Sequence, residues 1–316
     1  MTKLRDIIIN KDGFMDISIR PSRIFLMAVI ILIPCTWLSG QSPMTLKKPV
    51  RLILNEGSEL VGAIQAEEGD TIRFLTAGGL YLAVPRSQIR SCIALPGRIE
   101  EGRYLRPDPN QTRLFFAPTA RPLNGGQGYF SAYEVFFPFL AYGVGANLTL
   151  AGGMSLIPGA TTQLFYLAPK ITLYNSDRLS LAGGGLYLNT TAAFEEFSGA
   201  GIVYGVGSYG TDRAAATLGL GWGFYGDDFA NDPILMLGGE LRVSSSVKFI
   251  TENWFPPKSE AYPLSWGVRF FGDRLAADIA LIYPAGVRTS GFPFLPWLGF
   301  AYNFGLSEKP VDHYGP

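Results

Sequence analysis

Two short stretches of the sequence have the spacing of a nucleotide-binding loop. "GVGSYG" (205–210) and "GWGFYG" (221–226) both spell G-x-G-x-x-G, and they begin sixteen positions apart. In a dinucleotide-binding domain this loop leaves a strand and opens a helix, whose N-terminus receives the pyrophosphate. Here Gly210 leads into another strand-like stretch, and Gly226 leads into the turn-like run "DDFANDP". Because neither string opens a helix, we predict no nucleotide site and no other cofactor site.

A single histidine limits the catalytic chemistry that the chain can perform. It is His313, close to the C-terminal end of the 316 residues. Serine and cysteine hydrolases and most zinc sites place an imidazole inside the folded domain. The sequence therefore predicts no catalytic residue, no metal site and no enzyme.

A small set of charged residues stands singly among apolar and aromatic neighbours. Glu240 and Arg242 share one parity of an alternating stretch, while Leu237, Gly239 and Leu241 have the other. Such charges either contact a polar solute or pair with one another to hold an interior together. We expect the following residues to line a lumen: Glu134, Lys170, Glu240, Arg242, Arg269 and Asp278.

The region that carries these charges, residues 113–304, consists of alternating stretches of about ten residues separated by turn residues. No stretch has a sustained helical period with caps. Charged residues make up only 16 % of the chain, fewer than a water-soluble sandwich would show on its outer faces. The pattern predicts apolar residues facing lipid and small or charged residues facing inward, which is typical of an antiparallel transmembrane β-barrel.

The glycines of the two motifs are interpreted by the same parity. In "TLGLGWGFYG" (217–226), leucines and aromatic residues alternate with glycines. Strand side chains point to opposite faces in turn. We expect Tyr204, Val206, Leu218, Leu220 and Trp222 to face lipid, and the inward set to be Gly205, Gly207, Gly219, Gly221 and Gly223.

The number of strands follows from spacing. We take the segments to begin with "RLFFAPTA" (113–120) and "GYFSAYEVFFPFLAYG" (128–143). The 192 residues from 113 to 304, at about 16 per strand and turn, give about 12 strands, and bacterial single-chain barrels have even numbers. We predict 12, with 10 as the alternative.

The last of these segments, "GFAYNF" (299–304), carries the most specific pattern: Gly299, Tyr302 and Phe304 in the order G-x-x-Φ-x-Φ. It resembles the C-terminal strand by which outer-membrane barrels of Gram-negative bacteria are recognised by their assembly machinery. Two departures are Trp297, where the family has a polar residue, and the twelve residues after Phe304. The resemblance implies an outer-membrane location, with membrane lipid and the barrel-assembly machinery as partners.

The N-terminal segment is typical of a secretory signal. Arg20 and Arg23 precede an apolar run, Ile24 to Leu38, which suits a signal peptide better than a spanning helix of about 20 residues. We assign residues 1–41 to the signal, with Met15 as an alternative start. After its removal Cys92 is the single cysteine left, so no intrachain disulfide is expected.

Residues 47–97 predict a small soluble β domain, because short strands are divided by glycine-containing turns. The run L-x-x-G-x-x-x-x-G beginning at Leu54, followed by an acidic turn, resembles Sm-like and SH3-like barrels. The RNA-contacting Asn of the Sm-like family is missing, and 26 basic residues balance 26 acidic ones, so no nucleic acid is expected. A linker (98–112), the barrel (113–304) and a C-terminal tail (305–316) follow.

Together these patterns predict an all-β outer-membrane protein, a β-barrel preceded by a small periplasmic domain. Its function is expected to be that of a narrow channel or transporter for a small or apolar solute. The alternative is a structural anchor whose N-terminal domain binds a periplasmic protein.

Overall fold

The computed structural model describes residues 48–191, 199–288, 290–306 and 309–311. The predicted signal peptide and His313 lie outside these residues. Within the described part of the chain, no helix is long and apolar enough to cross a membrane.

The first sheet is built from the segment after residue 47 and from the C-terminal tail. Its antiparallel strands are β1 (Val50–Leu54), β2 (Glu59–Glu68), β3 (Thr71–Thr76), β4 (Tyr81–Pro85), β5 (Ile89–Ala94) and β22 (Lys309–Pro310), in the order β22-β5-β1-β2-β3-β4. A single 3₁₀ turn (Arg86–Gln88) joins β4 to β5. Leu52, Ile72 and Phe74 are fully buried, and the Cys92 side chain packs beside them. The tail that follows the barrel thus adds a strand to this sheet.

The predicted linker contains structure of its own. β6 (Arg98–Glu100) and β7 (Arg103–Leu105) form a two-stranded hairpin. The tight turn between them is made by Glu101 and Gly102, both at positive φ.

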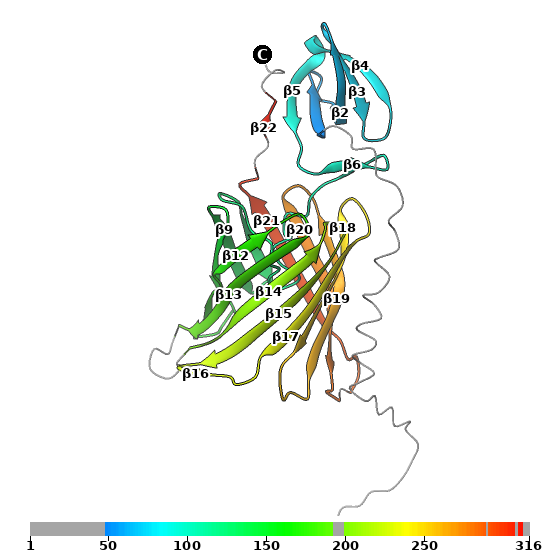
Figure 1. Ribbon diagram of the computed structural model, residues 1–316. Helices are drawn as coiled ribbons and strands as arrows, with labels where there is room; N and C mark the ends of the chain where they lie inside the picture. Colours follow the sequence, from blue (N-terminus) through cyan, green and yellow to red (C-terminus); the bar gives the residue numbers. More distant parts are fainter. Residues whose placement is uncertain (1–47, 192–198, 289, 307–308, 312–316) are drawn as a thin grey trace, which may run out of the picture. The chain divides into compact units, whose positions relative to one another are not determined.

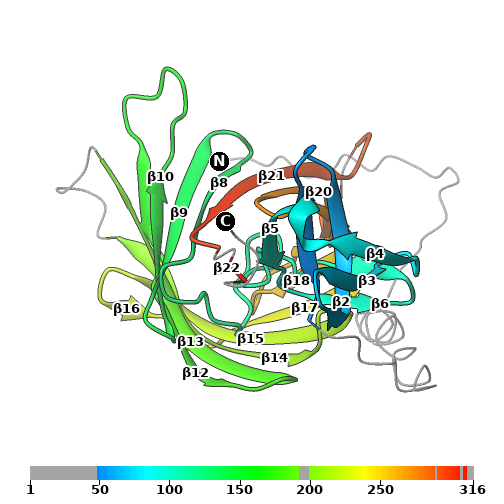
Figure 2. The same cartoon turned by 90° about the horizontal axis from the view of Figure 1, so that it is seen from above.

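A closed antiparallel barrel forms most of the remaining chain (Figures 1 and 2). Neighbouring strands pair in sequence order from β8 round to β21, and β21 then pairs with β8, so no edge is left open. β11 and β12 occupy one position in the wall, because both pair with β10 and β13. The wall therefore has twelve strands, which confirms the predicted number. Its strands are β8 (Gly128–Tyr133), β9 (Phe137–Val144), β10 (Leu148–Met154), β11 (Leu164–Leu167), β12 (Lys170–Asn175), β13 (Leu179–Thr190), β14 (Ala200–Gly210), β15 (Ala214–Tyr225), β17 (Ile234–Arg242), β18 (Val247–Phe255), β19 (Tyr262–Phe271), β20 (Leu275–Ala285) and β21 (Leu295–Phe304), with a short β16 (Asp228–Phe229) paired to β15.

Two expected segments differ from the structure, and their errors cancel in the count. Residues 113–120 form no wall strand, and residues 128–143 form two strands, β8 and β9, instead of one. The turn between these strands holds Glu134 at φ 47° and Val135 at φ 64°. Two consecutive positive φ angles are typical of a type I′ hairpin, which normally carries Asn or Gly. Because this turn has neither, the sequence gives no sign of it.

The inner and outer faces of the wall follow the predicted parity on β15 but not on β14. Leu218, Leu220 and Trp222 are exposed on the outside, as expected. Directly opposite residues of paired strands lie on one face, and the register places Gly205 opposite Leu220 and Gly219 opposite Val206. Gly205 and Gly207 therefore face outward, and Tyr204 and Val206 face the lumen, contrary to the prediction. Bulky residues of one strand lie opposite glycines of the next on both faces. On the inner face Gly221 makes room for its neighbours, because a Cβ there would lie 2.5 Å from Ile202 Cδ1 and 3.2 Å from Tyr204 Cβ, whereas a Cβ at the outward Gly205 would meet no atom within 4 Å.

The outer face of the barrel is apolar, and aromatic side chains gather near both ends of the strands. On one end, Tyr187 and Phe224 rings lie 6.5 Å apart and Trp266 and Phe294 rings 5.9 Å apart. Exposed aromatic residues also lie toward the other end of the strands: Tyr209, Phe270 and Tyr302. Leucine, isoleucine and valine side chains are exposed between them, for example Leu218, Leu220, Val203 and Ile279.

Candidate functional site: a plug and an apolar cavity in the lumen

The lumen is occupied by the segment that precedes the first wall strand. We call residues Asp108–Leu123 the plug. Leu114, Phe115, Ala117 and Ala120 of the plug are buried against inward residues of the wall: Ala182, Val206, Met236 and Ile250. The absence of a Cβ at Gly238 leaves room for the Leu114 side chain, because a Cβ there would lie 2.1 Å from Leu114 Cδ1.

The wall presents a row of charged side chains to the plug. Arg242, Lys248, Arg269 and Asp278 are cross-strand partners in succession on β17, β18, β19 and β20. Side chains in such a row share a face of the sheet. Here that face is the inner one, and Lys248, Arg269 and Asp278 are at most 1 % exposed.

Arg269 is the centre of the contact between plug and wall. Its Nε donates to Asp278 Oδ1 at 2.6 Å and its Nη2 to Asp278 Oδ2 at 3.2 Å. Its Nη1 lies 3.2 Å from Asp108 Oδ2 of the plug and donates to the carbonyl of Asn110 at 2.9 Å. A planar guanidinium can serve several acceptors at once in this way. One wall residue therefore fixes both a wall carboxylate and the plug backbone.

Further ion pairs tie the two parts together. Arg113 Nη1 of the plug donates to Asp278 Oδ2 at 2.6 Å, and Arg121 Nη1 to Glu240 Oε2 at 2.6 Å. Lys248 Nζ lies 3.2 Å from Asp108 and 3.0 Å from Glu240. These contacts join into one network with the cations Arg113, Arg121, Lys248 and Arg269 and the anions Asp108, Glu240 and Asp278. Four cations against three anions leave it with one excess positive charge.

Two other wall residues satisfy the backbone of the plug. Lys170 Nζ donates to the carbonyls of Thr119 and Arg121, each at 2.8 Å, and more weakly to that of Thr112 at 3.3 Å. Glu252 Oε2 accepts from the backbone N–H groups of Phe116 and Ala117, each at 3.0 Å. A buried loop lacks the ladder that satisfies strand backbone, so these side chains supply the missing donors and acceptors.

The structure places the six predicted lumen residues in two different settings. Lys170, Glu240, Arg242, Arg269 and Asp278 point to the inside of the barrel. Four of these five contact the plug. Arg242 instead contacts residues beside it: its Nη2 donates to the carbonyl of Arg106, which precedes the plug, at 3.0 Å and lies 3.4 Å from Asp212 Oδ2. Glu134 instead lies in the β8–β9 turn, where its Oε1 accepts from the backbone N–H of Leu298 at 2.7 Å. The predicted place of Glu134 on a strand face is therefore wrong, because its turn carries no Asn or Gly that would reveal it in the sequence.

Sequence reasoning missed the plug side of the network and part of the wall side. Asp108 lies in the predicted linker, Arg113 in the predicted first strand and Arg121 directly after it. Lys248 and Glu252 share the parity of the buried Ile250, so the alternation in "VKFITENWF" could have identified them. Nothing in the local sequence indicates that residues 108–123 enter the lumen.

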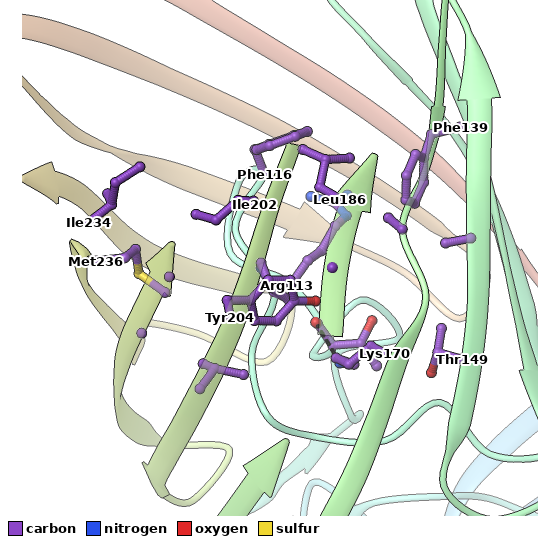
Figure 3. Close-up of a pocket in the computed structure, with 18 of the residues that line it drawn as sticks. Arg113, Phe116, Phe139, Thr149, Lys170, Leu186, Ile202, Tyr204, Ile234 and Met236 are labelled. Atoms are coloured by element: carbon purple, nitrogen blue, oxygen red, sulfur yellow. Dashed lines mark hydrogen bonds between the residues drawn. The ribbon is translucent and has the colours of Figure 1, made fainter. Parts of the chain in front are cut away.

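Beside the plug, the lumen contains an apolar cavity of about 100 Å³ that is partly open to solvent. Arg113, Phe116 and Pro118 of the plug line it. In Figure 3, Ile234 and Met236 lie on one side, Phe139 and Thr149 on the other, and Arg113 between them. Further lining residues come from six wall strands and are mostly aliphatic or aromatic: Tyr129, Tyr133, Ala151, Leu186, Ile202, Tyr204, Val206, Gly221 and Trp254.

Aromatic rings form a continuous surface on one side of the lumen. Tyr129 stacks on Phe139 at 6.2 Å between ring centroids, and Phe139 stacks on Tyr166 at 6.0 Å. Tyr133 lies 5.9 Å from Phe139 and 5.6 Å from Trp297. Rings at these separations pack favourably with one another and offer flat faces to an apolar molecule. Among the described residues no group of histidine, cysteine or carboxylate side chains could hold a metal ion.

The fold and the site together define a class of protein: a closed antiparallel barrel of twelve strands with a plug held in its lumen by ion pairs. Comparisons with protein-family models and with curated proteins found no match.

Solved structures give weak matches. A "KdgM porin" matches at a TM-score of 0.38 and 6 % identity, over 56 % of this chain and 95 % of that one. A NanC porin structure matches at 0.36 and 10 % identity, over 56 % and 97 %. A triple mutant of the Rhodopseudomonas blastica porin matches at 0.31 and 10 % identity, over 81 % and 97 %. At these TM-scores the matches identify neither a family nor a function for this chain.

Proposed function

We propose that this chain is an outer-membrane β-barrel protein of a Gram-negative bacterium. Its exposed outer face supports the proposal, since apolar side chains lie between two groups of aromatic residues, as in barrels that span a bilayer. Strands such as β14, β15 and β20 have 11 or 12 residues, enough for a tilted crossing, which needs about 9–11.

The lengths of the turns suggest an orientation. At the end where β8 begins and β21 ends, the turns have three or four residues (145–147, 176–178, 211–213, 243–246 and 272–274). At the other end most connections have six to nine (155–163, 226–233, 256–261 and 286–294). Outer-membrane barrels have short periplasmic turns and longer extracellular loops. We therefore assign the first end, and with it the N-terminal sheet, to the periplasm.

In this orientation the plug and the cavity lie at different depths. The charged row that holds the plug is close to the short turns, because Arg242 ends β17 and Arg269 lies near the end of β19. The cavity extends toward the long loops, where Ile202 and Met236 lie near the starts of their strands and Trp254 near the end of its strand. An apolar compartment thus faces outward, and the plug blocks its periplasmic side.

We infer that the protein takes a small apolar solute into the cavity and passes it inward when the plug moves. The observation that carries this inference is the apolar and aromatic lining of a cavity whose floor is a separately anchored plug. Pockets that bind small molecules are typically concave and mostly apolar with a few placed polar groups. A wide aqueous pore would require a polar interior instead.

The refolded full-length protein provides the test. Its gel migration should change on heating, as is usual for folded barrels, and it should require detergent to stay soluble. Planar-bilayer recording should show rare current steps, because the plug is closed in most molecules. Binding of 1-bromononane should quench the fluorescence of Trp254 in the cavity. Quenching should therefore be smaller in a Trp254→Phe variant, which keeps Trp297 in the lumen beside Tyr133 and the outward Trp222 and Trp266. A soluble chain without heat-modifiable migration would contradict the membrane assignment, and equal quenching in both chains would contradict the cavity assignment.

A second function is favoured by the extent of the plug. An anchor that never opens would have a lumen closed by buried ion pairs, and its N-terminal sheet would bind a periplasmic protein. Deletion of residues 49–95 distinguishes the two functions. A transporter should keep its current steps and solute binding after the deletion, whereas an anchor should lose a co-purifying partner and show no current before or after it.

The seam of the barrel supports recognition of β21 by the assembly machinery. β21 closes the ring by pairing with β8, and Phe304 lies directly opposite Gly128. We propose that the assembly machinery recognises Gly299, Tyr302 and Phe304 before β21 pairs with β8. Phe304→Ala should then lower the amount of protein inserted in cells while leaving detergent refolding unchanged, and equal losses in both assays would contradict the role.

A further inference from the structure

Arg113 has an unused edge at the floor of the apolar cavity. It is 3 % exposed and lines the cavity. Its Nη1 makes all the hydrogen bonds of the guanidinium, to Asp278 at 2.6 Å and to the carbonyls of Leu114 and Phe115 at 3.0 and 2.9 Å. Its Nε and Nη2 are buried and have no hydrogen-bond partner among the described residues. A buried donor without a partner is costly, so a ligand that supplies acceptors here would be favoured.

The two unused nitrogens form one side of the guanidinium. Nε–H and Nη2–H point in parallel, and this edge accepts both oxygens of a carboxylate at once. The guanidinium lies beside two aromatic rings, since Arg113 Cζ is 5.9 Å from the Tyr129 ring centroid and 5.4 Å from that of Tyr133, and its Nη1 is held by three hydrogen bonds. The edge is therefore fixed in orientation before any ligand arrives, which lowers the entropic cost of binding.

Two further observations favour an anionic head group. The ion-pair network to which Arg113 belongs carries one excess positive charge, which a single carboxylate would balance. Thr149 Oγ1, on the same cavity, is also buried without a partner and can donate to an oxygen. Above these polar atoms the lining is aliphatic and aromatic up to Trp254.

We propose that the cavity binds a monocarboxylate with an apolar body, its carboxylate on the Nε–Nη2 edge of Arg113 and its body directed toward the long loops. This assignment rests on the proposed function, since it names the class of solute that the cavity takes. It also places the head group against the residue that holds the plug to Asp278. A bound carboxylate therefore competes with Asp278 for the charge of Arg113.

The test compares 11-bromoundecanoate with 11-bromoundecanol, which differ in the head group alone. Quenching of Trp254 in the refolded full-length protein reports binding, with the Trp254→Phe chain as the blank and the free probe concentration measured in the same detergent. The acid should bind about tenfold more tightly than the alcohol or better, as expected for hydrogen bonds to a charged group. Arg113→Gln should remove this preference and leave the affinity for the alcohol within about threefold.

Two variants separate head-group binding from plug disruption. Arg121→Gln breaks a plug–wall ion pair of the same kind, but Arg121 does not line the cavity, so the preference for the acid should persist. Thr149→Val removes a hydroxyl that supports no protein contact and should lower the affinity for the acid alone.

Each outcome decides the proposal. An acid-to-alcohol ratio near one in the unmodified protein would overturn it while leaving the proposed apolar function intact, and this measurement requires no variant to fold. An equal loss of acid binding in Arg121→Gln would also overturn it. If neither probe quenched Trp254, the proposed function itself would fail.

Discussion

Removal of the Asp278 charge should release the plug. Asp278 accepts from Arg269 Nε and from Arg113 Nη1, each at 2.6 Å, and both cations are buried. In Asp278→Asn, Arg269 keeps Asp108, but Arg113 loses its one carboxylate partner in the network. The excess positive charge rises from one to two. When the plug leaves, Arg113 and Arg269 regain water, so the cost falls on plug docking and not on the barrel wall.

The size of the effect follows from the burial of the pair. Breaking a buried ion pair by removing one partner costs about 3–5 kcal/mol. Asparagine keeps one acceptor oxygen, so we take the lower end, about 3 kcal/mol. Since 1.4 kcal/mol is a factor of ten, the ratio of open to closed plugs should rise about 100-fold.

Planar-bilayer recording measures this ratio as the open probability of single molecules. Asp232→Asn is the matched control, because Asp232 makes the same kind of contact with Lys258 at 2.7 Å but in an exposed loop. Exposed pairs contribute about 1 kcal/mol or less, and this one does not touch the plug. An Asp278→Asn barrel that folds normally yet stays as closed as the control would refute the role of the ion pairs in holding the plug.

Three further predictions concern the plug and the small sheet. Gly238→Ala should destabilise plug docking by about 1–3 kcal/mol, because the new methyl would overlap Leu114. Urea unfolding, monitored by the heat-modifiable migration of the folded barrel on gels, measures this loss. The control Gly205→Ala adds its methyl on the outer face, where no atom lies within 4 Å, and should leave the unfolding curve unchanged. Lys170→Met should leave the carbonyls of the plug without their donor, which should destabilise plug docking by about 3 kcal/mol. Limited proteolysis should then cut residues 108–123 faster than in a Lys170→Arg control. Equal rates of cleavage in the two variants would argue against this contact. Burial raises the pKa of the Cys92 thiol from 9.0 to about 11, with a smaller effect of the Glu67 charge. In a chain whose other cysteine is replaced by serine, alkylation of Cys92 at pH 8 should therefore be about 100-fold slower than that of an unburied thiol, and its rate should rise with pH until about pH 11. Rapid labelling of the native protein at pH 8 would show that the small sheet does not bury this residue.

The alternation along the chain determined the architecture of the wall. A strand that is apolar on one face and small or charged on the other must find lipid on the first and a lumen on the second. For this reason Lys170, Glu240, Arg269 and Asp278 could be assigned to the inside from parity alone. The number of strands also came from local spacing, although the plug segment and the β8–β9 hairpin entered the count with opposite errors.

The sequence could not determine which face Gly205 and Gly207 occupy. Parity fixes which residues of one strand lie together, but not which of the two sets faces lipid. That choice depends on the register with the neighbouring strand, where Gly205 meets Leu220. The two G-x-G-x-x-G strings thus reflect a register that places glycines opposite bulky residues across a strand pair.

The position of the plug inside the lumen depends on tertiary contacts alone. Residues 108–123 have no period that distinguishes a buried loop from a linker followed by a strand. Their partners are the side chains of Lys170 and Glu252, which bind the plug backbone, and the charges of Arg269 and Asp278, and these partners lie 49 to 165 positions away in the chain. Local sequence encodes faces and turns, which are short-range properties of the backbone. Ion pairs across a lumen form only when the barrel has closed, so they appear first in the folded protein.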